Sequence, residues 1–197
     1  MTSTLKKISR RVALTLAVSA CFSPVTQAAE LLTEGVFKVG MEVTYPPFES
    51  YDSNNNIVGL DPDFAALIAQ HLQAKPQLID TKFTSLILGI GKKYDAVISG
   101  MYVTPERQKQ ADAIPYALSG ASIIALKGGA VQPKTEDELC GVKVGLQAGT
   151  TWVTSLKKHS DEWCLKNGKP AITIQEFPTA PEASQALLSK NIGAQLE

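Results

Sequence analysis

The sequence lacks an excess of charge of either sign. Its 197 residues include 19 lysines and arginines against 19 aspartates and glutamates. A protein that binds nucleic acid through its phosphates carries a basic patch, and an acidic interaction tail is visible as a run of like charges. Neither pattern is present, nor is an internal repeat or a low-complexity tract. We therefore expect no nucleic-acid partner, and the ligand has to be sought in local chemistry.

A hydrophobic run long enough to span a bilayer is also missing at the N-terminus. Residues 12–20 are apolar but too few, and a cationic region at 6–11 precedes them. Ala28 follows as a small residue suited to cleavage. This pattern predicts that residues 1–28 are a secretory signal peptide and that the mature chain is exported.

Two alternative export signals overlap this segment. The stretch "SRRVAL" (9–14) is similar to a twin-arginine signal, and "VSAC" (18–21) is similar to a lipobox that would make Cys21 a lipid anchor. Both depart from the usual pattern, at Ala13 and Val18 respectively. Plain export with removal of Cys21 is the favoured interpretation.

Cysteine is scarce, with three in the whole chain. After processing, Cys140 and Cys164 are the only pair, and their spacing resembles no metal motif. An oxidising compartment allows two thiols to persist as a bridge, so we predict a disulfide between them. Two buried free thiols are the alternative.

The remaining sequence alternates between strand-like and helix-like segments. Such alternation is typical of βαβ units and a mainly parallel sheet. The pattern stops at an extended stretch and then restarts, which predicts an α/β protein with lobe 1 at 29–120, a hinge crossover at 121–127 and lobe 2 at 128–197. In lobe 1 we expect strands at 36–42, 76–83 and 94–99, and helices at 61–73 and from Thr84. In lobe 2 we expect strands at 143–147 and 171–177, and helices at 135–139, from Thr151, and at 181–190.

The helix at 61–73 carries the clearest signals. Asp61 is suited to the N-cap and Pro62 to the first helical position, while Phe64, Leu67, Ile68 and Leu72 recur at helical spacing. We expect these four apolar residues to form the buried face of the helix.

Three polar segments follow predicted strands: "TYPPF" (44–48), "SGMYVTPER" (99–107) and "QAGTT" (147–151). Ligands of open α/β sheets bind outside the carboxyl ends of the strands. These segments bring together an aromatic ring, hydroxyl groups with an arginine, and backbone amides at the start of a helix. We therefore expect the ligand site where they meet.

The three segments lie within longer stretches that resemble one family, the polar amino-acid-binding proteins of bacterial ABC importers, solute-binding protein family 3. The stretches are "VGMEVTYPPFESYDSNNNIVGLDPDFAALIA", "YDAVISGMYVTPERQKQADAIPYALSG" and "LCGVKVGLQAGTT". The resemblance implies a two-lobed periplasmic-binding-protein clamshell, type II-like, that closes on a polar amino acid. It also implies a monomer without cofactor or metal, which is not an enzyme and delivers its ligand to a membrane permease.

The resemblance further implies a set of ligand-binding residues. Arg107 is the carboxylate clamp, because a guanidinium can form two parallel charge-assisted hydrogen bonds with a carboxylate. Glu42 matches an acidic position that reaches the far end of cationic or amide ligands, which favours a cationic amino acid. The other implied ligand-binding residues are Tyr45, Phe83, Ser99, Gly100, Tyr102, Thr150 and Thr151. Tyr102 departs from the family pattern, which often has Ser or Thr there.

The resemblance stops short at the C-terminus. The family's acceptor for the ligand ammonium lies one residue beyond the position of Glu197, and the return crossover and last helices of lobe 1 follow it. We therefore expect an incomplete lobe 2 and uncovered apolar surface on lobe 1. Two alternative functions stay open, a module of a longer membrane or cell-wall sensor, and a cyclohexadienyl or arogenate dehydratase. The dehydratase would use Glu42, since His71 and His159 lie on helical segments away from the strand ends.

Overall fold

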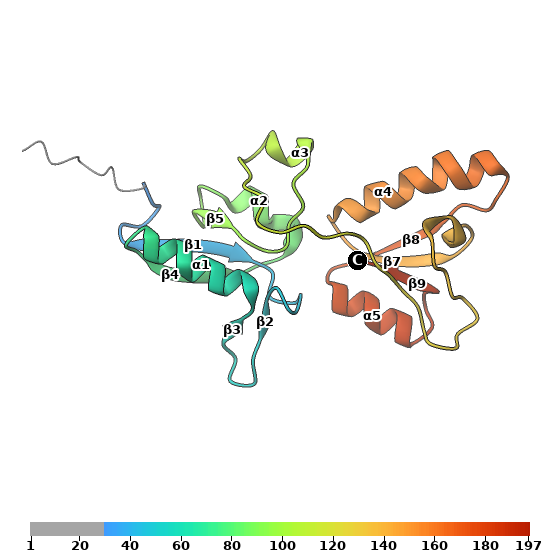
Figure 1. Cartoon of the computed structure of the whole chain (residues 1–197), viewed down its shortest axis with the longest axis horizontal. Helices are drawn as coiled ribbons and strands as arrows, with labels where there is room; N and C mark the ends of the chain where they lie inside the picture. The colour runs from blue at the N-terminus through green and yellow to red at the C-terminus, as the bar shows by residue number, and fades with distance from the viewer. Residues whose placement is uncertain (1–29) are drawn as a thin grey trace, which may run out of the picture.

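The computed structural model describes residues 30–197, so the predicted signal peptide and the alternative lipid anchor at Cys21 lie outside the described residues. Two lobes lie side by side, each built on its own sheet, and the C-terminus lies between them (Figure 1). The prediction of a two-lobed α/β fold is confirmed. None of the helices within residues 30–197 has the length and apolar character needed to cross a membrane.

Lobe 1 contains a parallel three-stranded sheet in the order β4-β1-β5. Its strands are β1 (Val36–Met41), β4 (Lys75–Asp80) and β5 (Ala96–Val97). A short antiparallel hairpin of β2 (Ser50–Tyr51) and β3 (Ile57–Val58) projects from it. β1 is central and its last residues are buried. Because β1 and β5 are parallel, their carboxyl ends lie at the same edge of the sheet.

The long helix of lobe 1 corrects two expectations. α1 spans Leu60–His71 with Gly59 as its N-cap, so Asp61 is not the cap but a fully buried residue of the first turn. The buried face consists of Asp61, Pro62, Ala65 and Ala69, whereas Phe64 and Leu67 are 37% and 54% exposed. Small residues allow α1 to approach the sheet closely, and the larger residues next to them are left outside.

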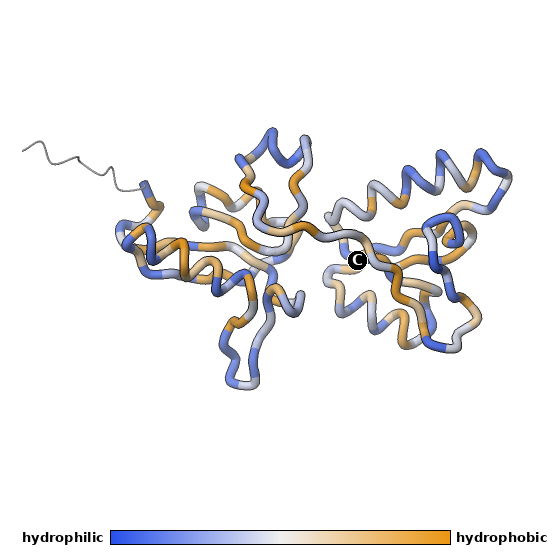
Figure 2. The backbone as a smooth tube through the Cα atoms, in the orientation of Figure 1, coloured by the Kyte–Doolittle hydropathy of each residue, from blue (hydrophilic) through white to orange (hydrophobic). Residues whose placement is uncertain are grey.

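Further apolar side chains of lobe 1 are exposed on the segment that leaves it. Ile114 and Leu118 are 90% and 100% exposed, and the main chain around them forms no strand. Elsewhere the helices alternate between polar and apolar positions, as the colours along the tube show (Figure 2). This connecting segment thus carries uncovered apolar side chains, and the expected exposure caused by missing helices stays a prediction.

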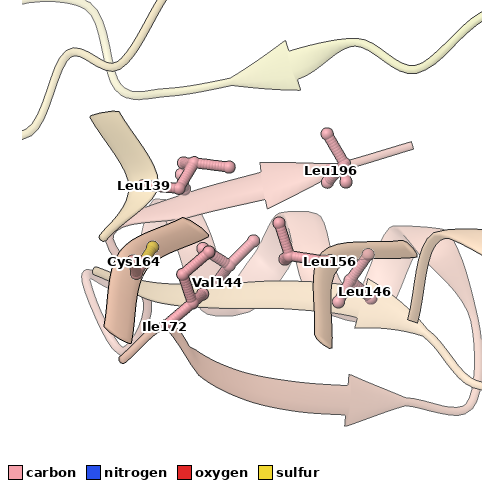
Figure 3. Close-up of a cluster of buried hydrophobic side chains, with 8 residues drawn as sticks. Leu139, Val144, Leu146, Leu156, Cys164, Ile172 and Leu196 are labelled. Carbon is pink, nitrogen blue, oxygen red and sulfur yellow. The ribbon is translucent and has the colours of Figure 1, made fainter. Parts of the chain in front are cut away.

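Lobe 2 contains a four-stranded sheet in the order β6-β9-β7-β8, with β7 parallel to β8 and β9 and with β6 antiparallel to β9. Its strands are β6 (Ile123–Ile124), β7 (Lys143–Gln147), β8 (Thr173–Phe177) and β9 (Ala194–Leu196). The helices α4 (Thr151–His159) and α5 (Ala180–Leu188) lie on either side of this sheet (Figure 1). Figure 3 shows the core between sheet and helical segments, where Val144, Leu146 and Leu156 are almost completely buried.

Several predicted elements are shorter or of another type. The predicted helix at 135–139 is the 3-10 helix η2 (Glu136–Leu139), and the one from Thr84 is the 3-10 helix η1 (Phe83–Ser85) followed by α2 (Leu86–Gly89). The predicted strand at 94–99 shortens to β5. The remaining short elements are α3 (Pro105–Gln108), the π-helix η3 (Ser160–Cys164) and the 3-10 helix η4 (Leu165–Asn167).

The predicted hinge at 121–127 contains β6, which pairs with β9 at Ile123–Leu196 and Ile124–Gln195. The middle of this segment is thus part of the sheet of lobe 2. The lobe boundaries themselves stay a prediction.

The predicted disulfide is present, with a Cα–Cα distance of 5.6 Å between Cys140 and Cys164. It joins the end of η2 to the end of η3 across a sequence separation of 24 residues. In the chain-entropy model, closing a loop of this size stabilises a protein by about 3 kcal/mol.

We expect reduction of this bridge to lower the melting temperature by several degrees, since about 1 kcal/mol shifts a domain of this size by roughly 2–4 °C. Calorimetry with and without reductant measures the change. The double variant Cys140→Ser/Cys164→Ser is the control and should be insensitive to reductant. Equal melting temperatures of oxidised and reduced protein would show that the bridge adds no stability.

Candidate functional site

One cavity lies between the lobes, at the carboxyl ends of β1, β5 and β7. The space inside it is about 580 Å³ when the open solvent at its mouth is included. The structure brings every predicted ligand-binding residue to its lining: Glu42, Tyr45, Phe83, Ser99, Gly100, Tyr102, Arg107, Thr150 and Thr151. That these residues contact a ligand stays a prediction.

Arg107 is held by main-chain groups and not by a carboxylate. Thr104 caps α3 by accepting a hydrogen bond from the Arg107 N–H at 3.2 Å, and Pro105 occupies the first turn. The guanidinium donates from Nη1 to the Tyr102 carbonyl at 2.7 Å and from Nη2 to the Gly149 carbonyl at 2.9 Å. Among residues 30–197 no carboxylate forms an ion pair with it, and burial lowers its pKa. The site thus holds a half-buried cation without a counter-ion, which favours an anionic group in the ligand.

Glu42 stands at the end of β1 and is buried. Its Oε1 accepts from the Phe83 N–H at 3.3 Å, and its Oε2 accepts from the Thr44 hydroxyl at 3.2 Å and from the Gln147 side-chain amide. Burial raises the pKa of Glu42, although these hydrogen bonds oppose the shift. The Gln147 contact crosses from lobe 1 to lobe 2.

Aromatic rings form much of the wall. Tyr45 stacks on Phe48 at a centroid distance of 5.5 Å, and the Arg107 guanidinium lies over the Phe83 ring at 5.6 Å. Tyr102 meets Trp152 of α4 edge-on at 4.9 Å. Tyr102 is therefore a packing partner of lobe 2, which accounts for an aromatic ring where the family often has a small hydroxyl residue.

The "QAGTT" segment closes the cavity from the side of lobe 2. Gly149 has a φ of +77°, a value that favours glycine, and Thr150 is the N-cap of α4. The Thr150 hydroxyl donates to the Gln147 carbonyl at 2.8 Å, which leaves the first backbone N–H groups of α4 beside the cavity. These groups add a second feature that favours an anion.

Several lining residues were not among the predicted ones: Glu49, Gln147, Trp152, Ala180, Gln195, Leu196 and Glu197. Gln147 directly ends β7, so the strand-end rule that selected Thr150 also applied to it. Glu197 accepts a hydrogen bond from the Gln195 amide at 2.7 Å, and burial raises its pKa. In the sequence analysis Glu197 was mentioned only because the family's acceptor for the ligand ammonium group lies one residue beyond its position.

Neither histidine lies in the cavity. His71 ends α1, and His159 ends α4 beside Asp137 at 3.1 Å. Within the described part of the chain, no group of three or more His, Cys, Asp or Glu residues is arranged to hold a metal ion.

Two lobes that meet around one cavity define the class of periplasmic binding folds, and the comparisons place the chain within it. Residues 37–189 match the family of bacterial extracellular solute-binding proteins, family 3. The chain belongs to this family. A solved structure, an ancestral arginine-binding protein bound to arginine, superposes with a TM-score of 0.75 at 35% identity, covering 83% of this chain and 70% of that one.

Two curated relatives come from Escherichia coli K12. ABC transporter arginine-binding protein 1 is 42% identical over 137 residues, which is 68% of this chain and 53% of the relative. L-cystine-binding protein TcyJ is 33% identical over 149 residues, or 74% of this chain and 53% of the relative. The chain thus spans about half the length of these relatives. Both are named as binding proteins, in agreement with the predicted class.

Proposed function

We propose that this chain binds a cationic amino acid between its lobes, as the periplasmic binding component of an ABC importer. The observation that carries the proposal is the unpaired, half-buried guanidinium of Arg107 in a cavity that also contains the carboxyl groups of Glu42 and Glu197. A zwitterion with a cationic side chain has one anionic and two cationic groups, and it complements this set of charges. The names of the arginine-binding relatives agree with this choice.

Each charged group has a distinct part in this proposal. Arg107 and the first N–H groups of α4 bind the ligand carboxylate, while Tyr45 and Phe83 pack against its apolar part. Glu42 receives the side-chain cation, and Glu197 offers an acceptor for the α-ammonium group. Burial raises the pKa of Glu42 and of Glu197, which favours their protonated forms in the empty site. A cationic ligand favours the ionised forms, so its binding should release protons from these two carboxyl groups.

The partners follow from the same proposal. We expect a periplasmic monomer that delivers its amino acid to a membrane permease, with no cofactor and no nucleic acid involved. Lobe closure around the ligand would present the permease with a surface that the open form lacks.

The test is a calorimetric competition screen of arginine, lysine, ornithine and histidine against glutamate and aspartate. We expect the cationic amino acids to bind best, because a carboxylate at Glu42 attracts a second cation and repels a second carboxylate. A screen in which the acidic amino acids bind best would contradict the proposal. Incubation with prephenate or arogenate tests the dehydratase alternative, and we expect no turnover.

We predict that Glu42→Gln removes the preference for cationic side chains. The amide preserves the shape of the side chain and can still accept the Phe83 N–H, but it lacks the charge. Arginine affinity should fall by at least about tenfold, or about 1.4 kcal/mol, while glutamine affinity changes little. Lys82→Gln, an exposed charge change on the neighbouring segment, is the control. Equal losses for arginine and glutamine would assign Glu42 a structural role only.

A further inference from the structure

Two carboxyl groups, those of Glu49 and Asp61, lie buried in lobe 1 and bond to adjacent residues, Ser99 and Gly100, at the edge of the cavity. Glu49 is 1% exposed and ends the turn after β1, and Asp61 is completely buried in the first turn of α1. The two segments are joined by the main chain, because the Asp61 N–H donates to the Phe48 carbonyl at 3.0 Å. Neither group has a role in the proposed ligand contacts.

Each carboxyl group has one oxygen with a hydrogen-bond donor and one without. Glu49 Oε1 accepts from the Ser99 hydroxyl at 2.6 Å. Asp61 Oδ2 accepts from the Gly100 N–H at 2.9 Å and from the Tyr116 hydroxyl at 3.0 Å. Glu49 Oε2 and Asp61 Oδ1 are buried and accept from no group within residues 30–197. Two buried carboxylates without hydrogen-bond donors on these oxygens would destabilise the folded protein. One proton held between the two oxygens would remove one negative charge and provide the donor that both lack.

We propose that Glu49 and Asp61 share one proton between Glu49 Oε2 and Asp61 Oδ1, and that this carboxyl pair positions Ser99 and Gly100 at the edge of the cavity. Ser99 and Gly100 line the cavity, and each is bonded to one member of the pair. The Ser99 hydroxyl also accepts from the Glu42 N–H at 3.0 Å, so the pair is connected to the end of β1.

The surroundings of the pair favour a retained proton. The ionisable neighbours of the pair are Glu42, at the end of β1, and Tyr116, on the segment after α3, and neither carries a positive charge. In the described chain no Lys, Arg or His forms an ion pair with Glu49 or Asp61. Burial, followed by the charge of Asp61 and that of Glu42, raises the pKa of Glu49 from 4.5 to about 8. Arg107 lines the same cavity, but its guanidinium bonds to the Tyr102 and Gly149 carbonyls.

The pair also connects to the aromatic wall. The Tyr45 N–H donates to the Glu49 carbonyl at 2.8 Å, and the Glu49 N–H donates back to the Tyr45 carbonyl at 3.0 Å. Gly100 has a φ of +52°, and a Cβ there would lie 3.6 Å from the Tyr45 ring. Three cavity residues from two segments, Tyr45 and the adjacent Ser99 and Gly100, thus contact this pair or its main chain. Their effect on a ligand rests on the proposed function, whereas the shared proton does not.

The experiment measures melting temperature from about pH 5 to about pH 9 for the wild type and for Glu49→Gln, Asp61→Asn and the double variant. A folded-state pKa raised to about 8 means that the native protein holds the proton between about pH 4.5 and 8, where the unfolded chain has lost it. Its stabilising contribution is therefore complete below about pH 4.5 and is lost as the pH rises to about 8. Wild-type melting temperature should fall by several degrees across this window relative to Glu49→Gln.

The amide variants test the geometry. In either single variant one amide NH₂ can replace the shared proton, so both should fold at neutral pH. In the double variant two amide groups face each other. Turning the amide at position 61 opposes the Gly100 N–H with a second donor, and turning the amide at position 49 removes the acceptor of the Ser99 hydroxyl. Its melting temperature should therefore fall by more than the sum of the single changes. Asp63→Asn, an exposed carboxyl change on the same helix, is the matched control and should follow the wild-type curve.

Two further readouts decide between the outcomes. The infrared spectrum at neutral pH should contain a protonated carboxylic acid band that Glu49→Gln lacks, and parallel pH curves together with no such band would overturn the shared proton. Calorimetry with arginine as the probe should show affinity falling above about pH 8 in the wild type and less so in Glu49→Gln. If arginine fails to bind at any pH, the proposed function fails while the stability curves still test the pair. If arginine binds with identical pH dependence in both proteins, the positioning role is wrong.

Discussion

Replacing Arg107 with alanine is expected to weaken amino-acid binding by roughly 30-fold to several thousand-fold. Truncating one partner of a buried charge pair typically costs about 2–5 kcal/mol, because the other charge is left desolvated and unpaired. In this cavity the ligand carboxylate would lose the cation, and the Tyr102 and Gly149 carbonyls would lose their donor. Calorimetric titration with arginine measures the change.

Arg107→Lys separates charge from geometry. Lysine keeps the positive charge, but its ammonium group cannot reproduce a planar fork that bonds two carbonyls and a carboxylate. We expect an intermediate loss of affinity. Lys109→Ala removes an exposed cation two residues away and should leave affinity within about twofold, since surface charges contribute little. Affinities within threefold of the wild type for both Arg107 variants would show that Arg107 is not the clamp.

The predicted site residues all line one cavity although several predicted elements are shorter, and the strand-end rule explains why. Residues that follow parallel strands converge on one edge whatever the strand lengths are. Arg107, Tyr45 and Thr150 therefore reach one cavity even though the predicted strand at 94–99 shortens to Ala96–Val97. Glu42 and Phe83 end the predicted strands at 36–42 and 76–83, and resemblance to a family was needed to assign them ligand contacts.

The missed features depend on contacts between distant segments. Asp61 looked like a helix cap because aspartate before proline is suited to that position. It is buried instead, because Tyr116 and Gly100 provide hydrogen bonds from segments that sequence spacing does not connect. Likewise, Gln195 reaches the cavity from β9 and Glu197 from the residue after it, and this three-residue strand is too short to produce a periodic pattern.

Contacts between the lobes are also invisible in the sequence. Glu42 meets Gln147, the Arg107 guanidinium bonds to the Gly149 carbonyl at 2.9 Å, and Tyr102 meets Trp152. All of these contacts lie around the cavity, so the lobes touch where a ligand would be enclosed. Binding that closes two lobes is stabilised by contacts made only in the closed state. One of the residues in these contacts offers a direct test of closure.

That residue is Gly149, and Gly149→Ala is expected to weaken arginine binding by about 5-fold to 150-fold. A Cβ at Gly149 would lie 2.9 Å from Thr84 Cγ2 across the two lobes, which is closer than real Cβ atoms approach. Overpacking of this kind typically costs about 1–3 kcal/mol, and here it would act on the closed state. Alanine at a φ of +77° also strains the turn itself, which should lower the melting temperature of the free protein.

A second substitution distinguishes the clash from the strain. Thr84→Ser removes Cγ2 and keeps the hydroxyl, so the next Thr84 atoms lie at 3.7 Å, an ordinary contact. The double variant Gly149→Ala/Thr84→Ser should recover most of the lost affinity but none of the lost melting temperature, because the backbone strain at Gly149 remains. Thr84→Ser alone should bind arginine as the wild type does. If the double variant binds as weakly as Gly149→Ala, the loss comes from the strained turn at the start of α4, and the contact between Gly149 and Thr84 does not limit closure of the lobes.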